Sequence, residues 1–347
     1  MRTFVTIAFT LYLGLVGSKA LAGTIPLESA EFMVSSGESG ISLFVRNKHP
    51  RDMTIFRPDN VLLYVHGSVT PAEADFDLPF GGISWMDFIA QHGYDVYFVD
   101  VRGYGRSTRP PEMDRPANGT PPVARTQIAV RDIGSVINFV KTRRHVAKLS
   151  LMGWSWGCAI MGSYAGDHND SVEKLILYAP TWLEPSTSQV STSQPPIGAY
   201  RTWSMESAKA RWLADVPEQQ RESLIPPGWF DQFAAAALAS DPKSSSRNPA
   251  AIRVPNGSAA DYVDGWSVGK PVYDPSKITV PTLIVHAEWD STNPAFMAQG
   301  VWKQLTRTSY KRYVEIGGGT HSIFKERNRM ELFREVQLFL DDAFTPE

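Results

Sequence analysis

The sequence predicts an α/β fold: a mostly parallel, doubly wound sheet with an inserted, largely helical cap. The main observation is a series of continuous apolar runs, rich in β-branched and aromatic residues, that helical patterns separate. These runs lie at residues 61–65, 94–99, 149–152, 175–178, 282–285 and 311–316. Apolar strands that alternate with helices are typical of a parallel sheet covered on both faces.

The helices expected around these strands carry apolar residues at helical intervals. Residues 126–143 form the longest one, and its core-facing stripe consists of Ile128, Ile133, Val136, Ile137 and Val140. Shorter helices are predicted at residues 84–91, 155–164 and 330–340. Residues 31–46 centre on Ser-Gly-Glu-Ser-Gly, which predicts an antiparallel hairpin ahead of the parallel strands.

Residues 181–271 interrupt the alternation of strands and helices. The interval has no strand pattern and is too long for a plain loop, so we expect a helical cap there. The cap then separates two parts of one core, residues 23–180 and 272–347. A stretch at 185–196 is rich in Ser, Thr, Gln and Pro, and its low apolar content predicts that it is the mobile part of the cap.

Composition and charge indicate a globular protein that acts on a small molecule. The chain has 347 residues, 43% of them hydrophobic and 20% charged, and its formal net charge is −2. This balance argues against nucleic acid, whose binding needs clustered Lys and Arg. The single cysteine, Cys158, is expected to be buried and cannot form an internal disulfide. No metal-ligand cluster, dinucleotide-binding glycine motif or phosphate loop occurs, so we predict no cofactor and no metal. Oligomeric state has no signal in the sequence.

The N-terminal residues 1–22 have the pattern of a signal peptide. Arg2 precedes an apolar run at residues 4–16, and small residues follow at Ala20 and Ala22. We expect cleavage after Ala22 and a secreted or periplasmic protein, with an N-terminal membrane anchor as the alternative. No later stretch is long and apolar enough for a transmembrane helix, so the mature chain is expected to have none.

The strongest chemical signal is Gly153-Trp-Ser155-Trp-Gly157, which follows the run at 149–152 and opens a helix of small residues. Gly-x-Ser-x-Gly between a strand and a helix holds a serine on a strained, exposed turn. Flanking glycines let the neighbouring backbone approach closely. Ser155 is therefore the predicted nucleophile.

A serine nucleophile needs a base, and the base needs a carboxylate that orients it. In folds with this turn the chain order is serine, acid, histidine. His321 follows the last strand in a glycine-rich loop, and Asp290 follows the run at 282–285. Glu288 is a rival for the acid, but its position favours a structural role.

Two backbone N–H groups are expected to form an oxyanion hole. One belongs to Ser68, just after the strand at 61–65, and the other to Trp156, directly after the nucleophile. His66 is interpreted as a structural imidazole that holds its loop.

Together these motifs resemble the α/β-hydrolase superfamily, and most closely its capped branch with proline iminopeptidases and related esterases. Residues 100–107 and 280–290 are similar to that branch, and the resemblance assigns Asp100 and Arg102 to a structural turn. The chain departs from iminopeptidases after Gly67, where an acidic insert with Glu73, Asp75 and Asp77 stands in place of a Gly-Pro-Gly run. A serine in the turn also differs from the aspartate of epoxide hydrolases and haloalkane dehalogenases.

The sequence thus predicts an exported serine hydrolase that cleaves a small to medium carboxylic ester or lactone through an acyl-enzyme. Trp154, Trp203 and Trp229 are the expected pocket residues, because aromatic rings favour apolar or planar ligands. An amidase or aminopeptidase and an acyltransferase would use the same triad. A catalytically silent, ligand-binding relative is the alternative outside the enzymes.

Overall fold

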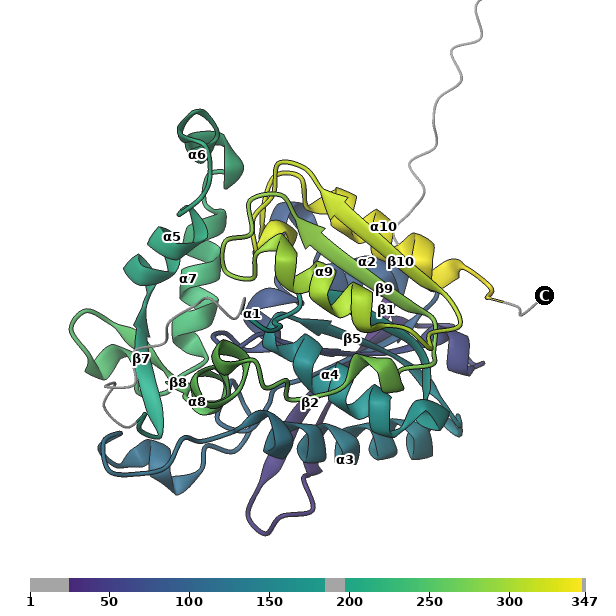
Figure 1. Cartoon of the computed structure of the whole chain (residues 1–347), viewed down its shortest axis with the longest axis horizontal. Coiled ribbons are helices and arrows are strands. Elements are labelled where there is room, and N and C mark those ends of the chain that lie inside the picture. The colour runs from purple at the N-terminus through teal and green to yellow at the C-terminus, as the bar shows by residue number, and fades with distance from the viewer. Residues whose placement is uncertain (1–24, 185–196, 345–347) are drawn as a thin grey trace, which may run out of the picture.

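The computed structural model describes residues 25–184 and 197–344, so the expected signal peptide and the stretch at 185–196 lie outside the described residues. Its centre is an eight-stranded sheet of order β1-β2-β4-β3-β5-β6-β9-β10 (Figure 1). The first two strands form the expected antiparallel hairpin, and the pairs from β4 to β10 are parallel. The strands are β1 Leu27–Ser35, β2 Ser42–Pro50, β3 Val61–Val65, β4 Asp95–Val99, β5 Leu149–Trp154, β6 Val172–Tyr178, β9 Thr282–Ala287 and β10 Lys311–Ile316. The predicted fold class and all six predicted parallel strands are confirmed.

Helices cover both faces of this sheet. One face packs on α3 (Thr126–Arg144), α4 (Trp156–Asp167) and α9 (Ala295–Gln304), and the other on α2 (Trp85–Gln91) and α10 (Arg329–Asp341). Strand β3 shows why its sequence is apolar throughout. Its residues alternate between the two cores, with Val61, Leu63 and Val65 on one face and Leu62 and Tyr64 on the other.

The insertion between β6 and β9 forms a separate layer beside the strand ends (Figure 1). Its helices are α5 (Met205–Trp212), α6 (Glu218–Leu224), α7 (Trp229–Ala239) and α8 (Gly257–Asp264). It also contains a two-stranded antiparallel sheet of β7 (Tyr200–Ser204) and β8 (Ala251–Pro255), which the sequence analysis did not expect. Each of these strands has five residues and mixes polar with apolar side chains, so neither gives an apolar run. Among the described residues, no helix has the length and apolar character to cross a membrane.

The turn after β4 is held by buried charged groups. The Asp100 carboxylate accepts hydrogen bonds from the N–H groups of Ala72 at 3.0 Å and Arg106 at 3.1 Å. The guanidinium of Arg102 forms a two-pronged ion pair with Asp132 on α3, at 2.5 and 2.6 Å. Both side chains are almost fully buried. The structural role that the family resemblance implied for Asp100 and Arg102 agrees with these contacts.

We expect Asp132→Ala to lower the free energy of unfolding by about 3 kcal/mol, because it removes the buried carboxylate of the pair and leaves the buried Arg102 guanidinium with the exposed Glu38, at 2.9 Å, as its counter-charge. Chemical denaturation measures the loss. Glu331→Ala is the matched control, since it removes a carboxylate from the exposed Arg334–Glu331 pair and should change stability by less than about 1 kcal/mol. Equal effects of the two substitutions would contradict the role of the buried pair.

Candidate active site

Ser155 lies on a sharp turn between β5 and α4, the elbow at residues 153–157. Its backbone has φ 57° and ψ −118°, which L-residues rarely adopt, and its N–H donates to the carbonyl of Tyr178 on β6 at 2.9 Å. A Cβ on Gly153 would lie 2.4 Å from the carbonyl group of Gly157. One on Gly157 would lie 2.4 Å from the carbonyl oxygen of Val65. Only glycine fits at both positions, and the motif has the strand, turn and helix that its sequence predicted.

Asp290 and His321 come together from the loops that follow β9 and β10. Nδ1 of His321 lies 2.7 Å from Oδ2 of Asp290, whose side chain is buried. The main chain at His321 is fixed as well, since its carbonyl accepts hydrogen bonds from Tyr178 at 2.7 Å and Trp154 at 3.0 Å. Glu288 is exposed and accepts a hydrogen bond from the N–H of Gly318 at 2.7 Å. The contact expected of the orienting acid is thus made by Asp290.

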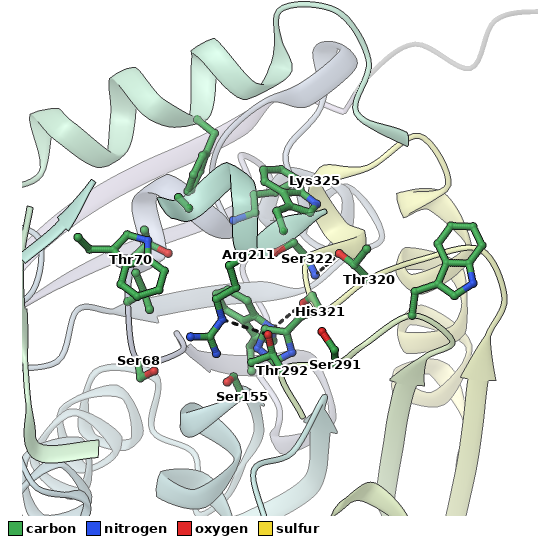
Figure 2. Close-up of a pocket in the computed structure, with 17 residues that line it drawn as sticks. Ser68, Thr70, Ser155, Arg211, Ser291, Thr292, Thr320, His321, Ser322 and Lys325 are labelled. Carbon is green, nitrogen blue, oxygen red and sulfur yellow. Dashed lines mark hydrogen bonds between the residues drawn. The ribbon is translucent and has the colours of Figure 1, made fainter. Parts of the chain in front are cut away.

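Ser155 and His321 face the same pocket (Figure 2). The hydroxyl of Ser155 accepts a hydrogen bond from Nδ2 of Asn293 at 3.4 Å, and among the described residues it has no hydrogen bond to His321. Serine–histidine contacts are often long in ligand-free enzymes and tighten when substrate binds. The structure therefore brings the three predicted residues to one place, with the serine and histidine not yet in contact.

Hydrogen bonds fix the main chain of the loop that contains Ser68. Buried His66 accepts a hydrogen bond on Nε2 from the N–H of Val101 at 3.0 Å, so its Nδ1 donates to the carbonyl of Gly67 at 2.6 Å. Burial lowers the pKa of His66 to about 4, which keeps the ring neutral. The carbonyl of Ser68 accepts hydrogen bonds from Tyr104 at 3.0 Å and Arg201 at 3.2 Å. His66 thus has the structural position that the sequence predicted.

Trp156 supplies the first N–H of helix α4, where a helix leaves its N–H groups without internal partners. Its ring points into the core and donates to the hydroxyl of Thr126 at 2.8 Å. Because the ring is buried, only the backbone of Trp156 can act at the site. Ser68 and Trp156 thus lie on the two segments that flank Ser155, as an oxyanion hole requires.

The pocket above Ser155 encloses about 80 Å³ between the core loops and the cap. Two of the predicted aromatic residues, Trp154 and Trp203, line it. Trp229 is not among the lining residues. Its ring packs on Phe80 with centroids 5.3 Å apart and lies 4.6 Å from the guanidinium of Arg329, which fastens α7 to the core. The aromatic residues that line the pocket beyond the predicted ones are Trp212, Phe233 and Trp289.

Comparison with protein families agrees with this geometry. The model of the alpha/beta hydrolase fold matches residues 60–328, which include the elbow, the cap and both loops of the acid and base. The chain belongs to the α/β hydrolase fold family. No curated protein sequence matches it.

Solved structures share this α/β hydrolase fold at low identity. A serine hydrolase from the polyaromatic hydrocarbon-degrading bacterium Cycloclasticus zankles is 15% identical, with 92% of this chain and 100% of that chain covered and a TM-score of 0.60. An esterase from Exiguobacterium antarcticum is 17% identical, with 90% and 99% covered and a TM-score of 0.55. A bromoperoxidase from Bacillus anthracis is also 17% identical, with 90% and 100% covered and a TM-score of 0.55. These proteins carry the names of different activities, so the shared fold does not fix the reaction.

One residue of this α/β hydrolase site was missed by the sequence analysis. Asn293 has a buried side chain, and its Nδ2 donates to the carbonyl of Ala179 at 2.7 Å and to the hydroxyl of Thr181 at 3.0 Å. Its backbone N–H donates to Oδ1 of Asp290 at 2.9 Å. Asn293 therefore links Asp290 to the segment after β6 and, through the contact at 3.4 Å, to the hydroxyl of Ser155. A single asparagine in a loop has no periodic signal, and only its place three residues after Asp290 could have suggested it.

Buried polar groups join the segment after His321 to the core and to the cap. Lys325 forms an ion pair with Asp75 at 2.9 Å, and both side chains are almost completely buried. Glu326 accepts hydrogen bonds from the hydroxyl and N–H of Thr320, next to His321, and from the cap ring of Trp212 at 2.7 Å. Burial raises the pKa of Glu326 to about 7. The cap and the histidine loop thus share one carboxyl group.

Cys158 lies below the elbow with its side chain fully buried. Its thiol donates to the carbonyls of Gly153 and Tyr178, and burial raises its pKa, so it remains a thiol. In residues 25–184 and 197–344, no group of three or more His, Cys, Asp or Glu side chains is placed to hold a metal ion.

We expect Asp290→Asn to lower kcat by about four orders of magnitude, because an amide cannot hold His321 in the tautomer that accepts a proton on Nε2. Hydrolysis of a 4-nitrophenyl ester measures the effect. Glu288→Gln is the control in the same loop and should stay within about tenfold of the parent, since its side chain contacts only the N–H of Gly318. The assignment of the acid is wrong if Glu288→Gln has the larger effect.

Proposed function

We propose that this α/β hydrolase is an exported serine hydrolase that cleaves a small to medium carboxylic ester or lactone. One observation carries the proposal: a serine on a strained elbow shares a pocket with a histidine that is hydrogen bonded to a buried aspartate. Ser155, His321 and Asp290 are then nucleophile, base and orienting acid.

The reaction proceeds through an acyl-enzyme. Oγ of Ser155 attacks the carbonyl carbon while Nε2 of His321 takes its proton, since Nδ1 is engaged with Asp290. The N–H groups of Ser68 and Trp156 stabilise the negative oxygen that forms. His321 then protonates the leaving oxygen, and the C–O bond breaks. A water molecule gives its proton to His321, attacks the acyl carbon and releases the acid, and Ser155 recovers its proton.

The pocket supports a small substrate portion beside the serine. Its volume of about 80 Å³ is less than the roughly 150 Å³ of an engineered cavity that binds benzene. Aromatic rings of Trp154, Trp203 and Phe233 line it, which suits short apolar acyl or alkoxy groups. Larger substrates would extend through the pocket mouth or displace the cap.

The pocket gives less support to an aminopeptidase, which must bind a substrate ammonium group. Among the described lining residues there is no aspartate or glutamate. The acidic insert is engaged elsewhere, because Glu73 and Asp77 pair with Arg46 and Asp75 pairs with Lys325. Amide cleavage and acyl transfer would still use the same three residues. A catalytically silent binding protein is the remaining alternative, and labelling distinguishes it.

We expect a fluorophosphonate probe to label the purified protein at Ser155, and Ser155→Ala to abolish both labelling and turnover. Loss of a triad nucleophile typically costs on the order of a million-fold in kcat. Mass spectrometry of the labelled peptide and rates on a panel of aryl esters, lactones and aminoacyl amides measure the two effects. Since the elbow depends on Gly153 and Gly157, Ser155→Ala should unfold at the parent's temperature. Activity of this variant within tenfold of the parent would place the nucleophile elsewhere.

Export is the second part of the proposal, and it rests on the charged, apolar and small-residue pattern of residues 1–22. We expect the mature protein from its natural host to begin at Gly23. N-terminal sequencing of the secreted or periplasmic fraction tests this. An intact Met1 on protein from the cytoplasm would contradict it.

A further inference from the structure

The charges that line the pocket are all positive. Apart from His321, the charged lining residues are Arg211 and Lys325, and among the described residues that line the pocket no carboxylate faces them. Lys325 is neutralised by Asp75 at 2.9 Å. Arg211 has no such partner among residues 25–184 and 197–344: it forms no ion pair, and the carboxylate that attracts it from a distance, Asp290, is already hydrogen bonded to His321.

Arg211 projects from helix α5 of the cap into the pocket (Figure 2). Its Nε donates to the hydroxyl of Thr292 at 3.2 Å, and its guanidinium carbon lies 5.6 Å from the ring centre of Trp203. A guanidinium carries five N–H donors, and among the described residues this is the one hydrogen bond it makes. The residue is exposed, so its free donors can reach a ligand.

A second guanidinium, that of Arg201, adds positive charge beside the loop that contains Ser68. Arg201 on β7 donates to the carbonyls of Ser68 and Pro255 and to the side chain of Asn256, at 3.0–3.2 Å. All three acceptors are neutral, and no described carboxylate forms an ion pair with Arg201. The cap thus brings to the site two guanidinium groups that form no ion pair with a described residue, and Arg211 is the one that keeps free N–H donors.

We propose that Arg211 binds a carboxylate of the substrate, so that the preferred substrates are anionic carboxylic esters or lactones. This deepens the proposed function and rests on it. A guanidinium pairs with a carboxylate through two parallel hydrogen bonds, and Thr292 holds the Arg211 side chain in place on the loop that carries Asp290. The carboxylate belongs either to the acyl group or to the leaving group.

Matched pairs of esters test both placements. Phenyl hydrogen succinate carries the carboxylate on the acyl side, with phenyl 4-methylpentanoate as its neutral partner. 4-Acetoxybenzoate carries it on the leaving group, with 4-acetoxyacetophenone as its neutral partner. With the uncatalysed rate subtracted, we expect kcat/KM to favour the anionic member of one pair by about 10- to 100-fold, the range of a hydrogen-bonded charge. The favoured pair identifies which side carries the carboxylate.

Variants at Arg211 test whether this residue causes the preference for anionic esters. Arg211→Gln should bring the ratio of kcat/KM for the anionic ester over its neutral partner close to one, whatever its effect on the absolute rates. Arg211→Lys should keep part of the preference, because an ammonium group supplies charge without the planar fork. Lys209→Gln removes a positive charge from the same helix at an exposed position that does not line the pocket, so it should keep the full preference. Equal rates on anionic and neutral esters, or a preference that survives in Arg211→Gln, would overturn the proposal.

Binding measurements distinguish a failure of this proposal from a failure of the proposed function. Calorimetry on Ser155→Ala should give at least tenfold tighter binding of the favoured anionic ester than of its neutral partner. The double variant Ser155→Ala/Arg211→Gln should bind the anionic ester and its neutral partner with equal affinity. Equal affinities in Ser155→Ala would refute the role of Arg211. Absence of fluorophosphonate labelling with an intact binding preference would instead refute the hydrolase and leave the carboxylate site in place.

Discussion

The close approach of β5 and α4 is the constraint on which the site depends. The backbone at Gly157 comes so near Val65 and Gly153 that neither glycine could carry a side chain. This contact seats the start of α4 against the ends of β3 and β5, which puts Ser155 at a positive φ with its side chain in the pocket. The same approach brings the first residue of α4 beside the end of β3, so the proposed nucleophile and the proposed oxyanion donors are positioned by one contact.

The cap is tied to this core by buried polar contacts rather than by apolar packing alone. Glu326 joins the ring of Trp212 to the main chain at Thr320, directly before His321. Buried charges are costly, and replacing them with apolar groups often leaves a protein as stable or more so. In this protein the buried polar contacts fix the positions of the segments that they join. The ring of Trp212 and the main chain before His321 share the Glu326 carboxyl group, which links the pocket roof to the proposed base through one side chain.

The sequence predicted the parts of the structure that local rules control. Continuous apolar runs marked the six parallel strands, and the glycine spacing around Ser155 marked the elbow. The sequence did not predict strands β7 and β8, because short segments that mix polar and apolar residues have the same pattern as loops. Trp229 was expected in the pocket, yet it packs on Phe80, since composition cannot tell which face of a cap helix looks inward. Asn293 and Arg211 act through partners distant in the chain, so no local pattern marks them.

The charge of the pocket lining also differs in sign from the net charge of the chain. A formal net charge of −2 suggests no preference for anions, but net charge averages over the surface, whereas recognition depends on the charges that remain unpaired at one place. The acidic insert beside the oxyanion loop would have made the site negative. Its carboxylates are instead engaged by Arg46, Lys48 and Lys325. The fold thus neutralises the acids of the insert and leaves Arg211 without an ion pair among the described residues, so the positive charge of the pocket lining follows from which ion pairs form around it.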